Sequence, residues 1–254
     1  MPPTSTHPWI FRPRPNPQAA LRLLCFPFAG GGASAFRTWP DALPSTIELW
    51  AIEPPGRESR SKEPLVRDLT AFVAALADAI GGELAPPFAI LGHSLGAMVD
   101  FAFARELRRR GLPGPLHLFA SGRRAPQLPE LAAIHELPDA AFTQWLRRLG
   151  GVPEAVFQEP ELLAYFFPIL RADIELNTVV LAADEPLDCP ITALRGADDD
   201  RVTAEQLDAW QAQTRGAFDR EVFPGGHFYI QTARSQFLAS LSQRLARVVA
   251  ATRA

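Results

Sequence analysis

The chain has 254 residues, of which 47% are hydrophobic and 21% are charged, a composition typical of globular proteins. A chain of this length can bury a sizeable core without disulfides or structural metals. Its 25 Lys and Arg residues against 28 Asp and Glu give a formal net charge of -3, and no long basic run occurs. Nothing in the sequence therefore points to a nucleic-acid partner.

The N-terminal segment has no basic start followed by an apolar stretch, and no window of the chain approaches 18 unbroken apolar residues. We therefore expect a soluble, cytoplasmic protein without a membrane partner. Its two cysteines, Cys25 and Cys189, lie far apart inside apolar runs and are expected to be buried, reduced thiols.

The first 20 residues are rich in proline, and we predict that they form an extended arm or surface strap rather than part of the core. A single domain is expected to span residues 21–254. Within it, apolar runs closed by glycine or proline predict strands. These runs cover residues 21–28, 47–52, 88–91, 116–120, 191–195 and 218–223.

Between these strands, apolar residues at helical spacing predict amphipathic helices. The predicted helices cover residues 65–80, 97–110, 205–213 and 231–249. Strands that alternate with helices at this spacing favour a mostly parallel, doubly wound α/β sheet with helices on both faces.

Residues 126–187 interrupt this alternation. Aromatic and aliphatic residues recur there at helical spacing, first around Phe142 and Trp145 and then from Leu162 to Leu170. A helical insertion of this length in an α/β sheet predicts a lid over one end of the sheet.

Gly92-His93-Ser94-Leu95-Gly96 matches the G-x-S-x-G pattern, in which a serine occupies a tight turn between a strand and a helix. The setting is the required one, because a predicted strand ends directly before the pattern and a predicted helix begins directly after it. We therefore predict that Ser94 is a catalytic nucleophile, and we expect the neighbouring His93 to be structural.

A serine hydroxyl needs a general base that is itself oriented by an acid, and on this type of sheet the three follow in the order serine, acid, histidine. His227 is the predicted base because it follows the last predicted strand. His117 lies within a strand, and His135 lies within the predicted lid. The acid is expected among the three consecutive aspartates at 198–200, which follow the strand at 191–195.

The chemistry also needs two backbone amides where negative charge develops, an oxyanion hole. One is expected from Leu95, directly after the nucleophile, and the other from the glycine-rich loop that follows the first core strand. Ala29 is the predicted donor in that loop, and Phe28 is the alternative.

The same loop supports a competing hypothesis. Gly30-x-Gly32-x-x-Ala35 matches the dinucleotide-binding pattern, and Glu53 ends the next strand, where a ribose-binding acid is expected. An NAD(P)-dependent oxidoreductase is therefore an alternative, although the serine pattern would then have no role. A non-catalytic binding module on the same fold is a further alternative.

Together these motifs resemble those of the type II thioesterases, the free-standing editing α/β-hydrolases of polyketide and nonribosomal peptide assembly lines. The resemblance extends from about residue 21 to residue 245. It rests on Phe26-Pro27-Phe28-Ala29-Gly30-Gly31, Glu53-Pro54-Pro55-Gly56-Arg57, Gly92-His93-Ser94-Leu95-Gly96, Ser121-Gly122-Arg123-Arg124-Ala125-Pro126, Leu170-Arg171-Ala172-Asp173 and Gly225-Gly226-His227-Phe228.

The resemblance implies an α/β-hydrolase fold with a helical lid. It places the nucleophile at Ser94, the base at His227 and the oxyanion amides at Ala29 and Leu95. Many members of the family carry histidine at the position of Phe28, a departure that we expect to matter little because the backbone amide does the work there.

The family's acid lies in a loop that reads roughly G-x-x-D-P-x-V. Aligned through Gly196 and Val202, this loop places the acid at Asp199. The chain has Asp200 where the proline is usual, so Asp200 remains the alternative acid.

The resemblance further implies hydrolysis of aberrant or stalled acyl groups from the phosphopantetheine arm of an acyl or peptidyl carrier protein, through an acyl-serine intermediate. No cofactor or metal is expected, and the protein is expected to be a monomer. A general carboxylesterase is an alternative, because the same three side chains attack oxoesters. Arg123 and Arg124, or the cluster Arg108-Arg109-Arg110, are candidates to meet an acidic carrier.

Overall fold

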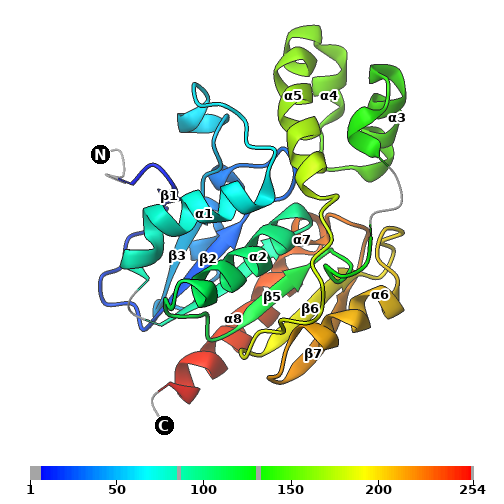
Figure 1. Ribbon diagram of the computed structural model, residues 1–254. Helices are drawn as coiled ribbons and strands as arrows, with labels where there is room; N and C mark the ends of the chain where they lie inside the picture. The colour runs from blue at the N-terminus through cyan, green and yellow to red at the C-terminus, as the bar shows by residue number, and fades with distance from the viewer. Residues whose placement is uncertain (1–6, 85–86, 130–132, 253–254) are drawn as a thin grey trace.

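The computed structural model describes residues 7–84, 87–129 and 133–252 (Figure 1). Its strands are β1 (Ile10–Phe11), β2 (Leu21–Phe26), β3 (Ile47–Ile52), β4 (Phe88–His93), β5 (Leu118–Ser121), β6 (Ile191–Gly196) and β7 (Phe218–Phe223). Its α-helices are α1 (Leu69–Ile80), α2 (Leu95–Arg109), α3 (Asp139–Leu149), α4 (Glu154–Gln158), α5 (Pro160–Leu176), α6 (Ala204–Asp208), α7 (Tyr229–Thr232) and α8 (Arg234–Ala251).

The strands form one seven-stranded sheet in the order β1-β3-β2-β4-β5-β6-β7, and only the β1–β3 pair is antiparallel. The chain runs outward from β2 to β3 and then returns to the other side of β2 as β4. At such a switch the loops leaving the two central strands diverge, and a crevice forms at their carboxyl ends. The loop after β2 and the turn after β4 therefore flank the usual ligand position of this sheet type.

Alternate residues of the strands belong to two cores on opposite faces of the sheet. Leu24 and Phe26 of β2 pack with residues of α1 and α2, whereas Leu23 and Cys25 pack with residues of α8. Figure 1 shows α1 and α2 on one face and α8 on the other. Because both faces are covered, the central strands β4 and β5 are buried along their whole length, whereas the edge strand β7 carries exposed charged residues. The predicted doubly wound sheet is confirmed.

The N-terminal segment contributes to the core, which differs from the prediction of an arm outside the fold. Ile10 and Phe11 form β1 and pair with the end of β3. Trp9 and Ile10 are 8% and 2% exposed, and the Trp9 ring stacks on Phe72 of α1. Two apolar residues among prolines show no periodicity, so the pattern could not reveal this strand. Residues 1–6 of the predicted arm lie outside the described residues.

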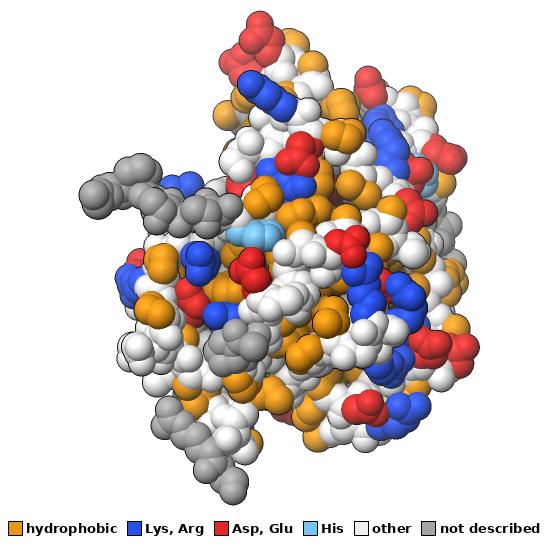
Figure 2. Space-filling view, turned by 60° about the vertical axis from the view of Figure 1, so that its left-hand side comes forward, with side chains coloured by type: hydrophobic (Ala, Val, Ile, Leu, Met, Phe, Trp, Pro, Cys, Tyr) orange, Lys and Arg blue, Asp and Glu red, His pale blue; other side chains and the backbone are white. Residues whose placement is uncertain are grey.

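Helices α3, α4 and α5 lie between β5 and β6 in the chain and stand beyond the carboxyl end of the sheet (Figure 1). They have a small core of their own, formed by Phe142, Leu146, Phe157, Leu170 and Ile174. Figure 2 shows this part projecting from the body of the protein, with acidic side chains at its tip. It occupies the region predicted as a lid, of which residues 130–132 lie outside the described part of the chain.

Capping residues set the helix boundaries where they differ from the predicted ones. Helix α1 begins at Leu69, because the Asp68 side chain accepts a hydrogen bond from Ala71 N at 2.6 Å. Thr203 and Gln206 form a capping box at α6, which continues as a 3-10 helix. Among the described residues, no helix is both long and apolar enough to cross a membrane.

Candidate active site

Ser94 occupies a sharp turn between β4 and α2, with backbone angles φ 55° and ψ -116°. A non-glycine residue in such a conformation is strained by about 1–3 kcal/mol. The flanking glycines are required by close backbone contact. A Cβ on Gly92 would lie 2.1 Å from the carbonyl carbon of Gly96, and a Cβ on Gly96 would lie 2.2 Å from Phe26 O. The turn therefore holds the Ser94 side chain at the carboxyl end of the sheet.

His227, in the loop after β7, connects Ser94 to Asp199. Its Nε2 atom lies 3.0 Å from Ser94 Oγ, and its Nδ1 atom lies 2.9 Å from Asp199 Oδ2. Because an ionised carboxylate only accepts hydrogen bonds, Nδ1 carries the proton and Nε2 is left to accept from the serine hydroxyl. This series can transfer the hydroxyl proton to the imidazole as the oxygen attacks a carbonyl carbon.

Among the three consecutive aspartates, the structure brings Asp199 to His227. The Asp199 side chain is 0% exposed, and its Oδ1 atom accepts a hydrogen bond from Arg201 N at 3.0 Å. Both oxygens of this carboxylate are thus engaged, one with the imidazole and one with its own loop. Asp198 and Asp200 are exposed. The geometry therefore supports Asp199 as the acid rather than Asp200.

A second hydrogen-bonded series lies behind His227. His93 Nδ1 lies 2.8 Å from Ser121 Oγ, which lies 2.5 Å from Tyr229 OH, and all three side chains are fully buried. Burial lowers the pKa of His93 well below its usual value, and the adjacent His227 lowers it further. His93 is therefore neutral and packs against His227, with 5.2 Å between the ring centroids.

Sequence reasoning gave Ser121 and Tyr229 no part in the site. Ser121 belongs to a motif shared with the resembling family, and Tyr229 lies two residues after the predicted base. These positions were the only sequence indications of the buried series. The side chains meet only because β4, β5 and α7 are neighbours in the fold.

The residues predicted to donate backbone amides to the oxyanion hole lie beside Ser94. Ala29 and the alternative Phe28 both line the cavity that contains Ser94. Leu95 is the first residue of α2, and the first four amides of a helix have no acceptor within the helix. The positive end of the α2 dipole lies there too and favours a developing negative charge.

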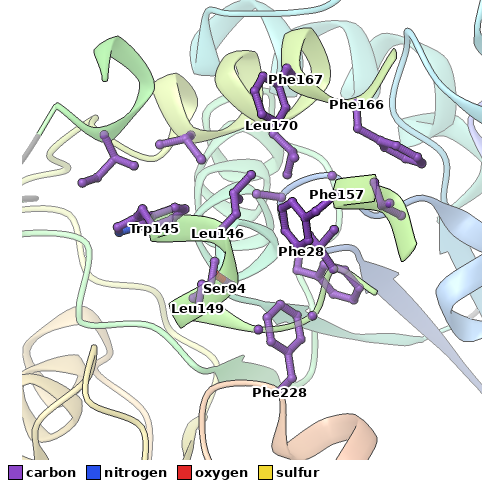
Figure 3. A pocket seen from close by; sticks show the side chains of 18 of the residues that line it. Phe28, Ser94, Trp145, Leu146, Leu149, Phe157, Phe166, Phe167, Leu170 and Phe228 are labelled. Carbon is purple, nitrogen blue, oxygen red and sulfur yellow. The ribbon is translucent and has the colours of Figure 1, made fainter. Parts of the chain in front are cut away.

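An apolar cavity opens over Ser94 (Figure 3). Its walls come from the loop after β2, from α3, α4 and α5, and from the loop that carries His227. The polar side chains that line it are those of Ser94, Asn177 and Arg201. The large apolar ones are Phe28, Ile134, Trp145, Leu146, Leu149, Phe157, Leu163, Phe166, Phe167, Leu170, Ile174 and Phe228. Such a cavity can bury an apolar chain whose reacting carbon lies at Ser94.

On a mostly parallel seven-stranded sheet, a strained serine hydrogen-bonded to a histidine and an aspartate defines an α/β-hydrolase. The chain belongs to the thioesterase domain family, which it matches over residues 21–245. The sequence-based predictions of this family and of its fold are confirmed, and the protein is a hydrolase of thioester bonds.

Known relatives extend along almost the whole chain. The chain is 41% identical over 244 residues to the gramicidin S biosynthesis protein GrsT of Aneurinibacillus migulanus, with 95% of each protein covered. RedJ, a thioesterase from the prodiginine biosynthetic pathway of Streptomyces coelicolor, is 39% identical with a TM-score of 0.83, covering 89% of this chain and 85% of RedJ. YbtT, a type II thioesterase from the yersiniabactin NRPS/PKS pathway, is 29% identical with a TM-score of 0.85, covering 95% and 99%.

One further relative is named as an oxidoreductase, the linear gramicidin dehydrogenase LgrE of Brevibacillus parabrevis, at 38% identity over 93% of this chain and 92% of its own. In this chain the Gly30–Ala35 loop leads into a 3-10 helix (Ala33–Phe36) rather than a helix N-terminus that could bind a pyrophosphate. The Glu53 carboxylate accepts hydrogen bonds from Ser59 N and Oγ. The oxidoreductase alternative is therefore not supported.

Proposed function

We propose that the protein removes aberrant or stalled acyl groups from the phosphopantetheine arm of an acyl or peptidyl carrier protein in a polyketide or nonribosomal peptide assembly line. The observation that carries this proposal is the hydrogen-bonded series Ser94–His227–Asp199 at the base of an apolar cavity. The names of GrsT, RedJ and YbtT, which tie them to biosynthetic pathways, support it.

In the first half of the proposed reaction, Ser94 Oγ attacks the thioester carbonyl carbon while His227 Nε2 takes the hydroxyl proton. The carbonyl oxygen becomes negatively charged in the tetrahedral intermediate, and the amides of Ala29 and Leu95 stabilise it. The carbon–sulfur bond then breaks. The departing sulfur takes the proton from His227, which leaves an acyl group on Ser94 and a free thiol on the arm.

In the second half, water attacks the acyl-Ser94 carbonyl carbon and gives a proton to His227 Nε2. The second tetrahedral intermediate breaks its bond to Ser94 Oγ, which recovers the proton, and a carboxylic acid is released. Asp199 keeps the imidazole in the required tautomer and stabilises its protonated form without taking the proton itself.

Helices α3, α4 and α5 act as a lid in this proposal. They supply most of the apolar wall over Ser94, so a bound acyl chain displaces water from the reacting carbon. The chain-length preference would then be determined by the depth and width of this wall.

Of the arginines that the sequence suggests for binding an acidic carrier protein, we propose Arg124. Arg123 is 5% exposed and donates to Asn177, so it is not available to a partner. The Arg108–Arg110 cluster lies at the far end of α2, about 20 Å from Ser94 along a 15-residue helix. Arg124 instead lies beside the loop of the candidate acid, where it donates to Arg201 O.

We further propose that the protein is a monomer and acts in the cytoplasm. Cys25 and Cys189 are free thiols, which fits a reducing compartment.

A panel of acyl-carrier and acyl-pantetheine thioesters of graded chain length tests the proposed function. Thioester hydrolysis is expected from the wild-type protein and none above background from Ser94→Ala, with an unchanged circular dichroism spectrum. Turnover of oxoesters without turnover of thioesters would support a general carboxylesterase instead. Thioester turnover that persists in Ser94→Ala would overturn the assigned nucleophile.

A further inference from the structure

The loop after β2 is held by two residues that are distant in sequence, Arg57 and Asp173. Gly30 N donates a hydrogen bond to Asp173 Oδ2 at 2.7 Å, and Arg57 Nη1 donates one to Gly31 O at 3.1 Å. Arg57 lies in the turn after β3, and Asp173 lies in α5. Both belong to motifs that carried the family resemblance, yet neither has a part in the mechanism above.

Arg57 and Asp173 also form a bidentate ion pair with each other. The Nη1–Oδ2 distance is 2.5 Å and the Nη2–Oδ1 distance is 2.7 Å, and the two side chains are 7% and 4% exposed. A buried fork of this kind has a fixed geometry, because both donors and both acceptors are engaged. The pair therefore joins the turn after β3, the loop after β2 and α5 into one unit.

These contacts determine which way the Ala29 amide points. Gly31 N donates to Phe28 O at 2.8 Å, which fixes the direction of the Phe28 carbonyl. That carbonyl and the Ala29 N–H belong to the same planar trans peptide group, so they point in opposite directions. Any displacement of Gly30 and Gly31 would therefore turn the Ala29 amide.

We propose that Arg57 and Asp173 are positioning residues for the oxyanion hole. Their ion pair holds Gly30 and Gly31 so that the Ala29 N–H faces the oxygen of the reacting carbonyl group. This inference rests on the proposed acyl transfer at Ser94.

Helix α5 approaches the same loop a second time through Leu170, which lies about one turn before Asp173. Figure 3 shows Leu170 among the residues that line the cavity. A Cβ on Gly30 would lie 2.6 Å from Leu170 Cδ2, and Gly30 has a φ of 76°, so a larger residue there would be strained and would displace the Leu170 side chain. The same helix therefore supplies part of the cavity wall and the carboxylate that positions the loop. Displacement of α5 would alter both the cavity and the oxyanion hole.

Asp173→Asn and Arg57→Lys test this proposal. The asparagine keeps the shape of Asp173 but loses its charge, and the lysine keeps the charge of Arg57 but loses the fork that reaches both Asp173 and Gly31. We expect kcat to fall about 10- to 100-fold in each variant, because the Ala29 donor is misaligned rather than removed. KM is expected to change by less than about threefold, because α5 keeps its place beside the cavity through the packing of Leu170 and Ile174 against α3.

Glu175→Gln is the matched control. Glu175 lies on the same helix and pairs with Arg67 at 2.5 Å, but this pair is solvent-exposed, with side-chain exposures of 36% and 52%. Exposed pairs of this kind contribute little. The control is expected to keep kcat within about twofold of the wild-type value.

The rate of Ser94 labelling by a fluorophosphonate gives a second readout. Phosphonylation also places negative charge in the oxyanion hole, so the labelling rate constant should fall in parallel with kcat.

Binding of a non-hydrolysable acyl-pantetheine thioether should be unchanged when Asp173→Asn is combined with Ser94→Ala. The labelling assay can be carried out without knowing the natural acyl group. A wild-type protein that labels but does not hydrolyse thioesters would overturn the proposed function and leave this test intact.

A purely structural ion pair would lower the melting temperature and leave the labelling rate and kcat per folded molecule unchanged. That result would overturn the proposal, and so would an equal loss of activity in Glu175→Gln. Circular dichroism reports the folded fraction of each variant. If one of the two variants does not fold, the other decides.

Discussion

Asp199 Oδ2 lies 2.9 Å from His227 Nδ1, while the side chain of the next residue, Asp200, is exposed. The other oxygen of Asp199 accepts a hydrogen bond from Arg201 N, so the carboxylate is also held by its own loop. A carboxylate held on both sides cannot rotate away from the imidazole when the imidazole becomes charged. The partner of His227 Nδ1 is therefore Asp199 and not the exposed Asp200.

This geometry predicts unequal effects for two neighbouring substitutions. Asp199→Asn should lower kcat by about 10³- to 10⁴-fold, because an amide at this position no longer favours the tautomer with its proton on Nδ1. Asp200→Asn, the matched control, should stay within about twofold. Steady-state hydrolysis of one acyl-pantetheine substrate measures both. A larger loss in Asp200→Asn would assign the acid to Asp200.

The strained turn at Ser94 predicts that activity and stability oppose each other at this position. Glycine adopts a positive φ without strain, whereas alanine does not. Ser94→Gly should therefore be more stable than Ser94→Ala by about 1 kcal/mol, and both should be inactive. Urea unfolding followed by fluorescence measures the difference.

The matched control for this comparison is Ala97→Gly in the first turn of α2. At a helical position glycine should destabilise by about 1 kcal/mol, which is the opposite sign. A Ser94→Gly protein no more stable than Ser94→Ala would argue against strain at the turn.

The cavity wall predicts a change in chain-length preference. Leu163 lines the cavity from α5, whereas the adjacent Leu162 is 40% exposed. Leu163→Trp should fill part of the cavity and lower kcat/KM for long acyl chains by about 10-fold, with a smaller effect on short chains. Leu162→Trp should leave the preference unchanged. Equal profiles for both variants would place the acyl chain elsewhere.

Because of His117, we expect the folded protein to be less stable in mild acid. Its Nε2 atom lies 2.8 Å from Thr192 Oγ1, and burial lowers the pKa of His117 to about 4, with Arg244 lowering it further and Asp219 opposing the shift. The unfolded chain, with an ordinary histidine pKa near 6.5, binds more protons between pH 6.5 and 4. Stability therefore falls as the pH drops through that window.

Urea unfolding at pH 7 and pH 5 measures this effect. The wild-type protein should lose about 2 kcal/mol more than His117→Gln between these two pH values. The buried, neutral His93 remains in both proteins and contributes equally to each. An identical pH dependence for the two proteins would show that His117 becomes protonated in the folded state.

Several features of this protein could be predicted because they are encoded within short stretches of sequence. The turn around Ser94 depends on glycines two residues away on either side, and the alternation of strands and helices depends on local periodicity. His227 could be predicted as the base because, in this order of elements, the base is expected after the last strand, and the structure brings it to Ser94 and Asp199. The main secondary-structure elements of the sheet followed from the sequence for the same reason, with boundaries adjusted by caps such as Asp68.

Other features depend on contacts between distant segments, and only the tertiary structure decided them. Asp199 and Asp200 have the same chemistry, and the loop geometry around His227 distinguishes them. Ile10 joins the sheet because the edge of β3 is available to it. Arg57 and Asp173 are 116 residues apart in the chain and meet because the sheet places their loop and helix side by side. Such pairings leave no local pattern in the sequence, because their partners are determined by how the elements pack.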